Sequence, residues 1–258
     1  MSLQVEIRSE SGDGVHTPYR HVGSNEDLEF AEWEDRTRVV LEPIAAPSIL
    51  GLYGFAGATF IVAAHLAGWY GDSESAFYLF PFAAFFGGLA QFIAGLYAFR
   101  ARDALATAMH GMWGSFWLGY GVLYAFFATG VLVEPAGDFP ELGFWFLALG
   151  AITLVGAIAA MAENVILAGV LTSLAGGAVI AAIANLAGNS GAETLAGYFF
   201  IVAAGLAFYL ASAMMLESTY GQVVLPTGKW NRAANILGRH VTHPIEYEQG
   251  MPGVRQGQ

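Results

Sequence analysis

Residues 165 to 187 read VILAGVLTSLAGGAVIAAIANLA, a run of 23 residues without a charged side chain. A helix needs about 20 mostly apolar residues to cross the hydrocarbon layer of a bilayer. A transmembrane β-barrel would instead show alternating polarity in segments of about ten residues. The run therefore predicts a membrane-spanning helix.

Five more apolar runs of similar length lie on either side of this one, and together they predict an all-α membrane protein. The six predicted spans are residues 46–69, 76–99, 104–129, 142–161, 165–187 and 194–216. We place them in one transmembrane domain, residues 43–220, and expect a six-helix bundle.

Composition supports the same class. Of the 258 residues, 56% are hydrophobic and 12% are charged, and glycine occurs 33 times. Cysteine is absent, which excludes disulfides, thiolate zinc sites and a cysteine nucleophile. The net charge of -11 comes largely from residues 1–42, which hold ten of the 21 carboxylates. No basic patch is present to bind phosphates, so we expect no nucleic-acid partner.

The positions of the basic residues predict the orientation. All ten Lys and Arg side chains fall in the N-terminal tail, in the second connection (Arg100 and Arg102) and in the C-terminal tail. Six spans place these three regions on one side of the membrane. By the positive-inside rule that side is the cytoplasm, so the protein is predicted to be a multi-pass protein of the cell membrane.

Both tails are thus expected to be cytoplasmic. Residues 1–42 mix acidic, Ser and Gly residues and predict a disordered tail. The alternative is a short amphipathic helix around Leu28, Phe30 and Trp33. Residues 221–258 form the second tail.

Small residues at helical spacing predict close helix packing in the second span. Gly87, Gln91 and Gly95 recur every four residues, which places an amide on a small-residue face. Gln91 either bonds across a helix interface or lines an aqueous path, since a buried amide needs a partner and a permeating anion can be one.

An aromatic stripe marks the third span. Its members recur every three or four residues: His110, Trp113, Trp117, Tyr120 and Tyr124. Such a stripe indicates packing, subunit contact or the wall of a path. His65 and His110 are either satisfied buried histidines or proton-linked groups.

Two amides stand at the far end of the fifth span. Asn185 and Asn189 are one turn apart, where they either capture a carboxylate or cap the helix.

The six cores hold no Asp, Glu, Lys or Arg side chain near the membrane centre, so the path is expected to be largely neutral. This favours a small weak acid over a multivalent metal ion, which would require carboxylate or thiolate ligands. No zinc-protease, nucleophile-elbow or Walker pattern is present, and we expect no enzyme activity, no metal site and no cofactor.

Five ordered strings resemble those of the acetate uptake transporter family. They are APSILGLYGF (46–55), GGLAQFIAGL (87–96), GSFWL (114–118), NLAGN (185–189) and YGQVVLPTG (220–228). The first resembles the family signature Asn-Pro-Ala-Pro-Leu-Gly-Leu, which it matches at Pro47, Leu50, Gly51 and Leu52. Its asparagine and second proline are replaced here by Ala46 and Ile49.

The resemblance implies a six-helix protomer that assembles into a homo-hexamer, with one path in each protomer. It implies a hydrophobic constriction at Phe55, Trp113 and Leu174, with Trp113 in place of the family tyrosine. It also places Pro47, Leu50, Gly51, Gln91, Asn185 and Asn189 along the substrate pathway.

The function implied is transport of acetate, with succinate as a second substrate, by an anion channel or by proton symport. Two alternatives stay open: a channel for another small solute, such as water or ammonium, and a sensory or structural membrane protein of the same fold that has lost transport.

Overall fold

The computed structural model describes residues 44–72 and 74–240. The expectations for residues 1–42 and for the last part of the C-terminal tail lie outside these residues. The described part is almost entirely helical, and the expected all-α membrane fold is confirmed.

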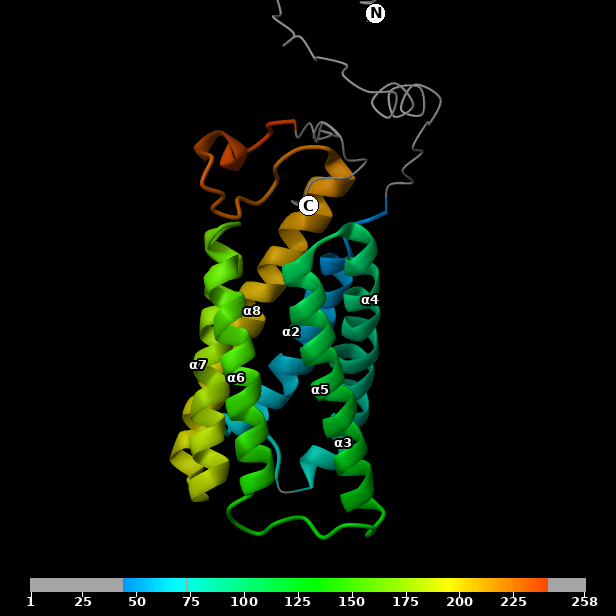
Figure 1. The fold of residues 1–258 in the computed structure, drawn as a ribbon, viewed down its shortest axis with the longest axis vertical. Coiled ribbons are helices and arrows are strands. Elements are labelled where there is room, and N and C mark those ends of the chain that lie inside the picture. The colour runs from blue at the N-terminus through cyan, green and yellow to red at the C-terminus, as the bar shows by residue number, and fades with distance from the viewer. Residues whose placement is uncertain (1–43, 73, 241–258) are drawn as a thin grey trace, which may run out of the picture. The chain divides into compact units, whose positions relative to one another are not determined.

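Six helical rods make up the described bundle (Figure 1). One of them is continuous from Ser75 to Ala101, although its hydrogen-bond pattern changes twice along its length. The elements are α2 (Pro47–Leu66), α3 (Ser75–Ala83), η1 (Ala84–Ala90), α4 (Gln91–Ala101), α5 (Ala104–Ala128), α6 (Pro140–Ala160), α7 (Val165–Ala187) and α8 (Ser190–Tyr220). A short 3-10 helix, η2 (Arg232–Asn235), follows.

Five of the six rods are long and apolar enough to cross a membrane by length and composition. The exception is α5, which at 25 residues is long enough. It is less apolar because it carries the histidine, tryptophan and tyrosine side chains of the aromatic stripe. The polar and aromatic side chains of α5 are those of the stripe, for which the sequence left packing, subunit contact and the wall of a path open.

The bundle has two ends, which we name by the connections they hold. The loop side holds residues 67–74, 129–139 and 188–189, and the tail side holds residues 102–103, 161–164 and 221–240. Three of the connections end in a side chain that caps the next helix. Asp103 Oδ1, Asn164 Oδ1 and Asn189 Oδ1 accept backbone N–H groups at the starts of α5, α7 and α8, at 2.8, 2.8 and 2.9 Å.

Small residues set the helix contacts. α6 packs on α7, α7 on α8 and α8 on α2, while α4 and η1 pack between α2 and α5. At Gly95 an added Cβ would lie 2.8 Å from the backbone nitrogen of Gly111, so α4 and α5 meet backbone to backbone. At Gly197 it would lie 2.7 Å from the Ala67 nitrogen, which fixes α8 against α2. This is the packing that a lipid environment favours.

A π-helical segment interrupts the second rod. η1 widens the helix directly after α3, which contains Pro81. Gly87 lies in this segment, and an added Cβ there would come within 2.7 Å of both Ala58 and Trp117. Such segments occur often at functional sites, and this one lets the backbone approach an indole ring.

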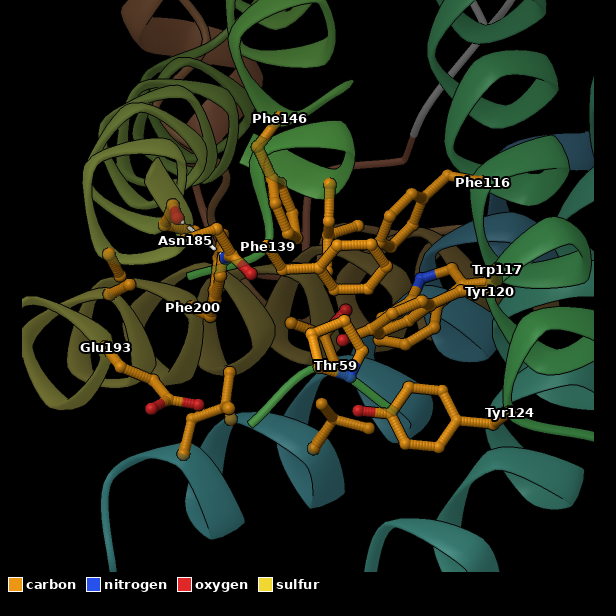
Figure 2. A pocket seen from close by; sticks show the side chains of 18 of the residues that line it. Thr59, Phe116, Trp117, Tyr120, Tyr124, Phe139, Phe146, Asn185, Glu193 and Phe200 are labelled. Atoms are coloured by element: carbon orange, nitrogen blue, oxygen red, sulfur yellow. Dashed lines mark hydrogen bonds between the residues drawn. The ribbon is translucent and has the colours of Figure 1, made fainter. Parts of the chain in front are cut away.

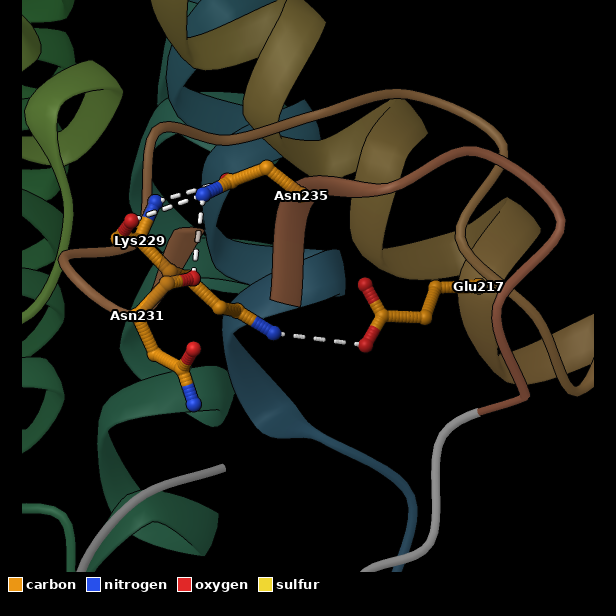
Figure 3. A network of polar contacts seen from close by, with 4 residues as sticks. All are labelled: Glu217, Lys229, Asn231 and Asn235. Carbon is orange, nitrogen blue, oxygen red and sulfur yellow. Dashed lines mark hydrogen bonds and ion pairs between the residues drawn. The ribbon is translucent and has the colours of Figure 1, made fainter. Parts of the chain in front are cut away.

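The described part of the C-terminal tail is ordered against the bundle as a strap, residues 221–240. Ile166 N donates to Thr227 O at 3.3 Å, and Trp230 Nε1 donates to Met161 O at 2.6 Å. Figure 3 shows the Lys229 ammonium paired with the Glu217 carboxylate at 3.3 Å and the Asn235 amide bonded to the Lys229 backbone. The strap therefore ties the end of α8 to the turn between α6 and α7.

Candidate functional site

A cavity of about 190 Å³ opens among α2, α5, α6, α7 and α8 on the loop side. Its wall is largely aromatic, as Figure 2 shows. The rings come from the stripe on α5 and from α6, α8 and the connection before α6: Trp113, Phe116, Trp117, Tyr120, Tyr124, Phe127, Phe139, Phe146 and Phe200. The stripe predicted from the sequence therefore lines a cavity over most of its length.

Trp113 at the floor of the cavity meets Phe55. The two ring centroids are 6.2 Å apart in an edge-on arrangement, and both side chains are 2% exposed. Leu174 is equally buried and belongs to the same hydrophobic cluster. The structure thus brings Phe55 and Trp113 into contact and places Leu174 in the surrounding core. The constriction itself stays a prediction.

The indole N–H of Trp113 is held in place. It donates to Thr153 Oγ1 at 3.0 Å, and this hydroxyl donates in turn to Leu149 O at 2.7 Å. Thr153 is fully buried, so the pair is shielded from solvent. The indole that replaces the family tyrosine is therefore anchored to α6 by a satisfied hydrogen bond.

Two other polar atoms on the cavity wall have no hydrogen-bond partner among the residues that the structure describes. They are Thr59 Oγ1 and Trp117 Nε1, each on a side chain that is 4% exposed. Leaving a buried donor unpaired costs about 1–3 kcal/mol. Sequence reasoning missed Thr59, although its position one turn after Phe55 on α2 was a usable signal. For Trp117, as a member of the stripe, it left packing, subunit contact and the wall of a path open.

On the tail side, Gln91, His110 and Gly51 come together. Gln91 Nε2 lies 3.5 Å from His110 Nδ1, and both side chains are at most 5% exposed. Gln91 Oε1 has no partner. An added Cβ on Gly51 would lie 2.5 Å from the His110 ring, so the glycine makes room for the imidazole. Gly51 and Gln91, predicted for the path, thus meet His110, predicted as a possible proton-linked group, in one buried cluster.

The remaining candidates are spread along the bundle. Pro47 begins α2, and Leu50 is 47% exposed on its surface. Asn185 lines the loop-side cavity, with its Nδ2 donating to Ala181 O at 2.8 Å. Asn189 is exposed and caps the start of α8, whereas the capping interpretation concerned the end of the preceding helix, where Gly188 is the cap. His65 is half-buried, with Nδ1 3.2 Å from Tyr70 O.

One acidic group outside the membrane-spanning helices is perturbed. Partial desolvation raises the pKa of Glu163 in the turn between α6 and α7, and the nearby Asp103 carboxylate raises this pKa further. Both groups lie on the tail side, apart from the cavity.

Comparison with known proteins gives consistent matches. The sequence profile of the GPR1/FUN34/yaaH family matches residues 34–230. The Escherichia coli K12 succinate-acetate/proton symporter SatP is 29% identical over 188 residues, covering 72% of this chain and 96% of SatP. The ammonia transport outward protein 2 of Saccharomyces cerevisiae is 28% identical over 172 residues, covering 66% of this chain and 61% of the yeast protein. The solved bacterial acetate channel SatP matches with a TM-score of 0.64 at 28% identity, covering 72% of this chain and all of the channel.

Proposed function

Because the chain belongs to the GPR1/FUN34/yaaH family, we propose that it carries acetate or a similar small carboxylate across the membrane. The observation that carries this proposal is the pair of unpartnered donors on the wall of the loop-side cavity. The two SatP relatives are named for acetate transport, and they support the same substrate class.

The chemistry of the cavity fits such a substrate. Trp117 Nε1 can only donate a hydrogen bond, and Thr59 Oγ1 can donate one as well. A carboxyl group offers acceptor oxygens to both, which removes the cost of two buried unpaired donors. The aromatic rings around them provide apolar contact for the short carbon chain of the substrate.

Beyond the cavity, the route in our proposal continues past Phe55 and Trp113 toward the tail side. There the polar cluster of Gln91 and His110 is the next point that can hydrogen-bond a substrate. The proposal also includes the cytoplasmic location of both tails and a homo-hexamer with one path in each protomer. Either an anion channel or a proton symporter is compatible with this route.

A second candidate substrate is ammonium. The yeast relative is named for ammonia transport. The mouth of the cavity holds the carboxylates of Glu134 and Glu193 beside tyrosine rings, which are groups that attract cations. If ammonium is the substrate, excess ammonium will abolish protein-dependent uptake while acetate will not compete.

Uptake of labelled acetate into proteoliposomes tests the main proposal, with and without an inward proton gradient. Phe55→Ala and Trp113→Ala should widen the path, raise acetate flux several-fold and admit larger carboxylates. Phe60→Ala, on the same helix as Phe55 but 47% exposed and outside the cavity, should leave the flux unchanged.

Core truncations of this size cost about 3–5 kcal/mol, so each variant must first elute as folded protein. Trp113→Phe provides a milder change if Trp113→Ala does not fold. Unchanged flux in both Phe55 and Trp113 variants would remove these residues from the path. Absence of protein-dependent acetate flux in the folded parent would contradict the proposed function.

A further inference from the structure

Two carboxylates stand at the mouth of the cavity. Glu134 lies in the connection between α5 and α6, and Glu193 lies in the first turn of α8. Both line the cavity of the candidate site, and both also line a second loop-side cavity that shares Tyr120 and Tyr124 with the first. Figure 2 shows the Glu193 carboxylate and the Tyr124 hydroxyl pointing inward from opposite walls. A solute that enters from the loop side must therefore pass between acidic groups.

The charge of the whole loop side is negative. All Lys and Arg residues of the sequence lie in the tails or in the connection between α4 and α5. The loop side carries four further acidic residues outside the two cavities: Asp72, Glu74, Asp138 and Glu141. A cleft lined by charges of one sign, with walls of low dielectric constant, concentrates their field. The mouth thus repels a carboxylate anion before the anion can reach the donors inside.

The polar groups of the cavity are sorted by depth. Deep in the cavity are the two unpartnered donors, Thr59 Oγ1 and Trp117 Nε1, on side chains more than nine-tenths buried. At the mouth are the acceptor oxygens of the two glutamates. An un-ionised carboxylic acid has a carbonyl acceptor for the donors and a hydroxyl donor for the acceptors. The anion satisfies only the first set, and ammonium would leave the Trp117 N–H unpaired.

We propose that Glu134 and Glu193 form a charge filter that admits the substrate as the neutral, protonated acid and excludes its anion. This inference rests on the proposed function and specifies the chemical form of its substrate. The proton travels on the substrate's own carboxyl oxygen, so each acid molecule carries one proton with it. The filter makes transport electroneutral without an ionisable residue at the membrane centre.

Other titratable groups face the filter from each element around it. His65 faces it from α2, while Tyr120 and Tyr124 face it from α5. The residues that α3 presents to this space are apolar: Ala76, Leu79 and Phe80. His65 is the only described basic group among the residues that line the mouth.

Two measurements on the full chain test the filter: labelled acetate uptake into proteoliposomes at pH 5 and pH 7, and acetate current across planar bilayers at pH 7. The variants are Glu134→Gln/Glu193→Gln and, as a matched control, Glu141→Gln, which lies on the same side but outside both cavities. Flux through protein-free vesicles is subtracted. Parent uptake should fall about tenfold per pH unit above the pKa of the acid, in step with the neutral fraction.

The double variant should show a shallower fall of uptake with pH and a rise of about tenfold in acetate current at pH 7. Glu141→Gln should behave like the parent. Parent-like uptake and current in the folded double variant would overturn the filter while leaving carboxylate transport in place. Absence of protein-dependent acetate uptake in the parent at either pH would overturn the proposed function, and the filter with it.

Discussion

The two halves of the route are built differently. On the loop side, aromatic rings surround a cavity of about 190 Å³ and leave two donors without partners. On the tail side, Gly51, His110 and Gln91 are so closely packed that an added methyl group on Gly51 would overlap the imidazole. The loop-side half is therefore ready to receive a small solute. The tail-side half must rearrange at the contact between α2 and α5 before a solute can pass.

The largest effect should come from filling the tail-side contact. Gly51→Ala places a methyl group 2.5 Å from the His110 ring, and overpacking of this kind costs about 1–3 kcal/mol. Gly57→Ala makes the same change on the same helix where nothing lies within 4 Å, so it should cost nothing. Thermal unfolding midpoints in detergent measure both. Equal midpoints for the two variants would mean that the tail-side half is as loosely packed as the cavity.

A smaller effect should follow from removing one loop-side donor. Trp117→Phe keeps an aromatic wall but deletes the unpaired N–H, so the fold should keep its stability while the substrate loses a hydrogen bond worth about 1 kcal/mol. The acetate concentration for half-maximal uptake should rise about fivefold. Trp145→Phe, on an indole that is 51% exposed, is the matched control. A parent-like concentration dependence for Trp117→Phe would make this donor irrelevant to the substrate.

The smallest effect concerns Glu163, which lies away from the route. Its raised pKa means that the folded state holds this proton more tightly than the unfolded chain does, so stability falls as pH rises past the unfolded pKa. Glu163→Gln removes that loss and should unfold at a slightly higher temperature than the parent at pH 7. Near pH 3, where both states are protonated, the midpoints should coincide. A difference that is the same at both pH values would contradict the electrostatic cause.

Much of the fold followed from the sequence because lipid imposes a simple rule on chain length and polarity. The run at residues 165–187 coincides with α7, and the other apolar runs predicted helices whose ends the structure places within a few residues. The largest shift is in α8, which continues to Tyr220, so that Glu217 lies inside the helix, paired with Lys229 of the strap. Gly221 caps this end in the left-handed conformation, a local signal that hydropathy alone does not use.

The site was less accessible to sequence reasoning. The resemblance led to Phe55 and Trp113, which do touch, and to Gln91, which does meet His110. Thr59 was missed because a hydroxyl inside a helix usually bonds to the preceding turn. Only the three-dimensional arrangement shows that this one lacks a partner. Asn189 is the opposite case, a residue that the sequence suggested for substrate capture. Its side chain accepts a backbone hydrogen bond at the start of α8, and this capping role accounts for its presence.

The π-helical segment η1 has a consequence for how this rod can be altered. Each residue of an α-helix advances the chain by about 100° around the axis. A π-helical segment takes up about one extra residue for the same total rotation, so a change that let all of Ala84–Ala90 adopt α geometry without shortening the chain would turn everything before it by about that angle relative to α4. Phe80, now stacked on Tyr124 with ring centroids 3.9 Å apart, would then leave the aromatic wall. The segment thus works as a phase offset between the two ends of one helix, and a single-residue deletion here that restores α geometry should be better tolerated than one elsewhere in the rod.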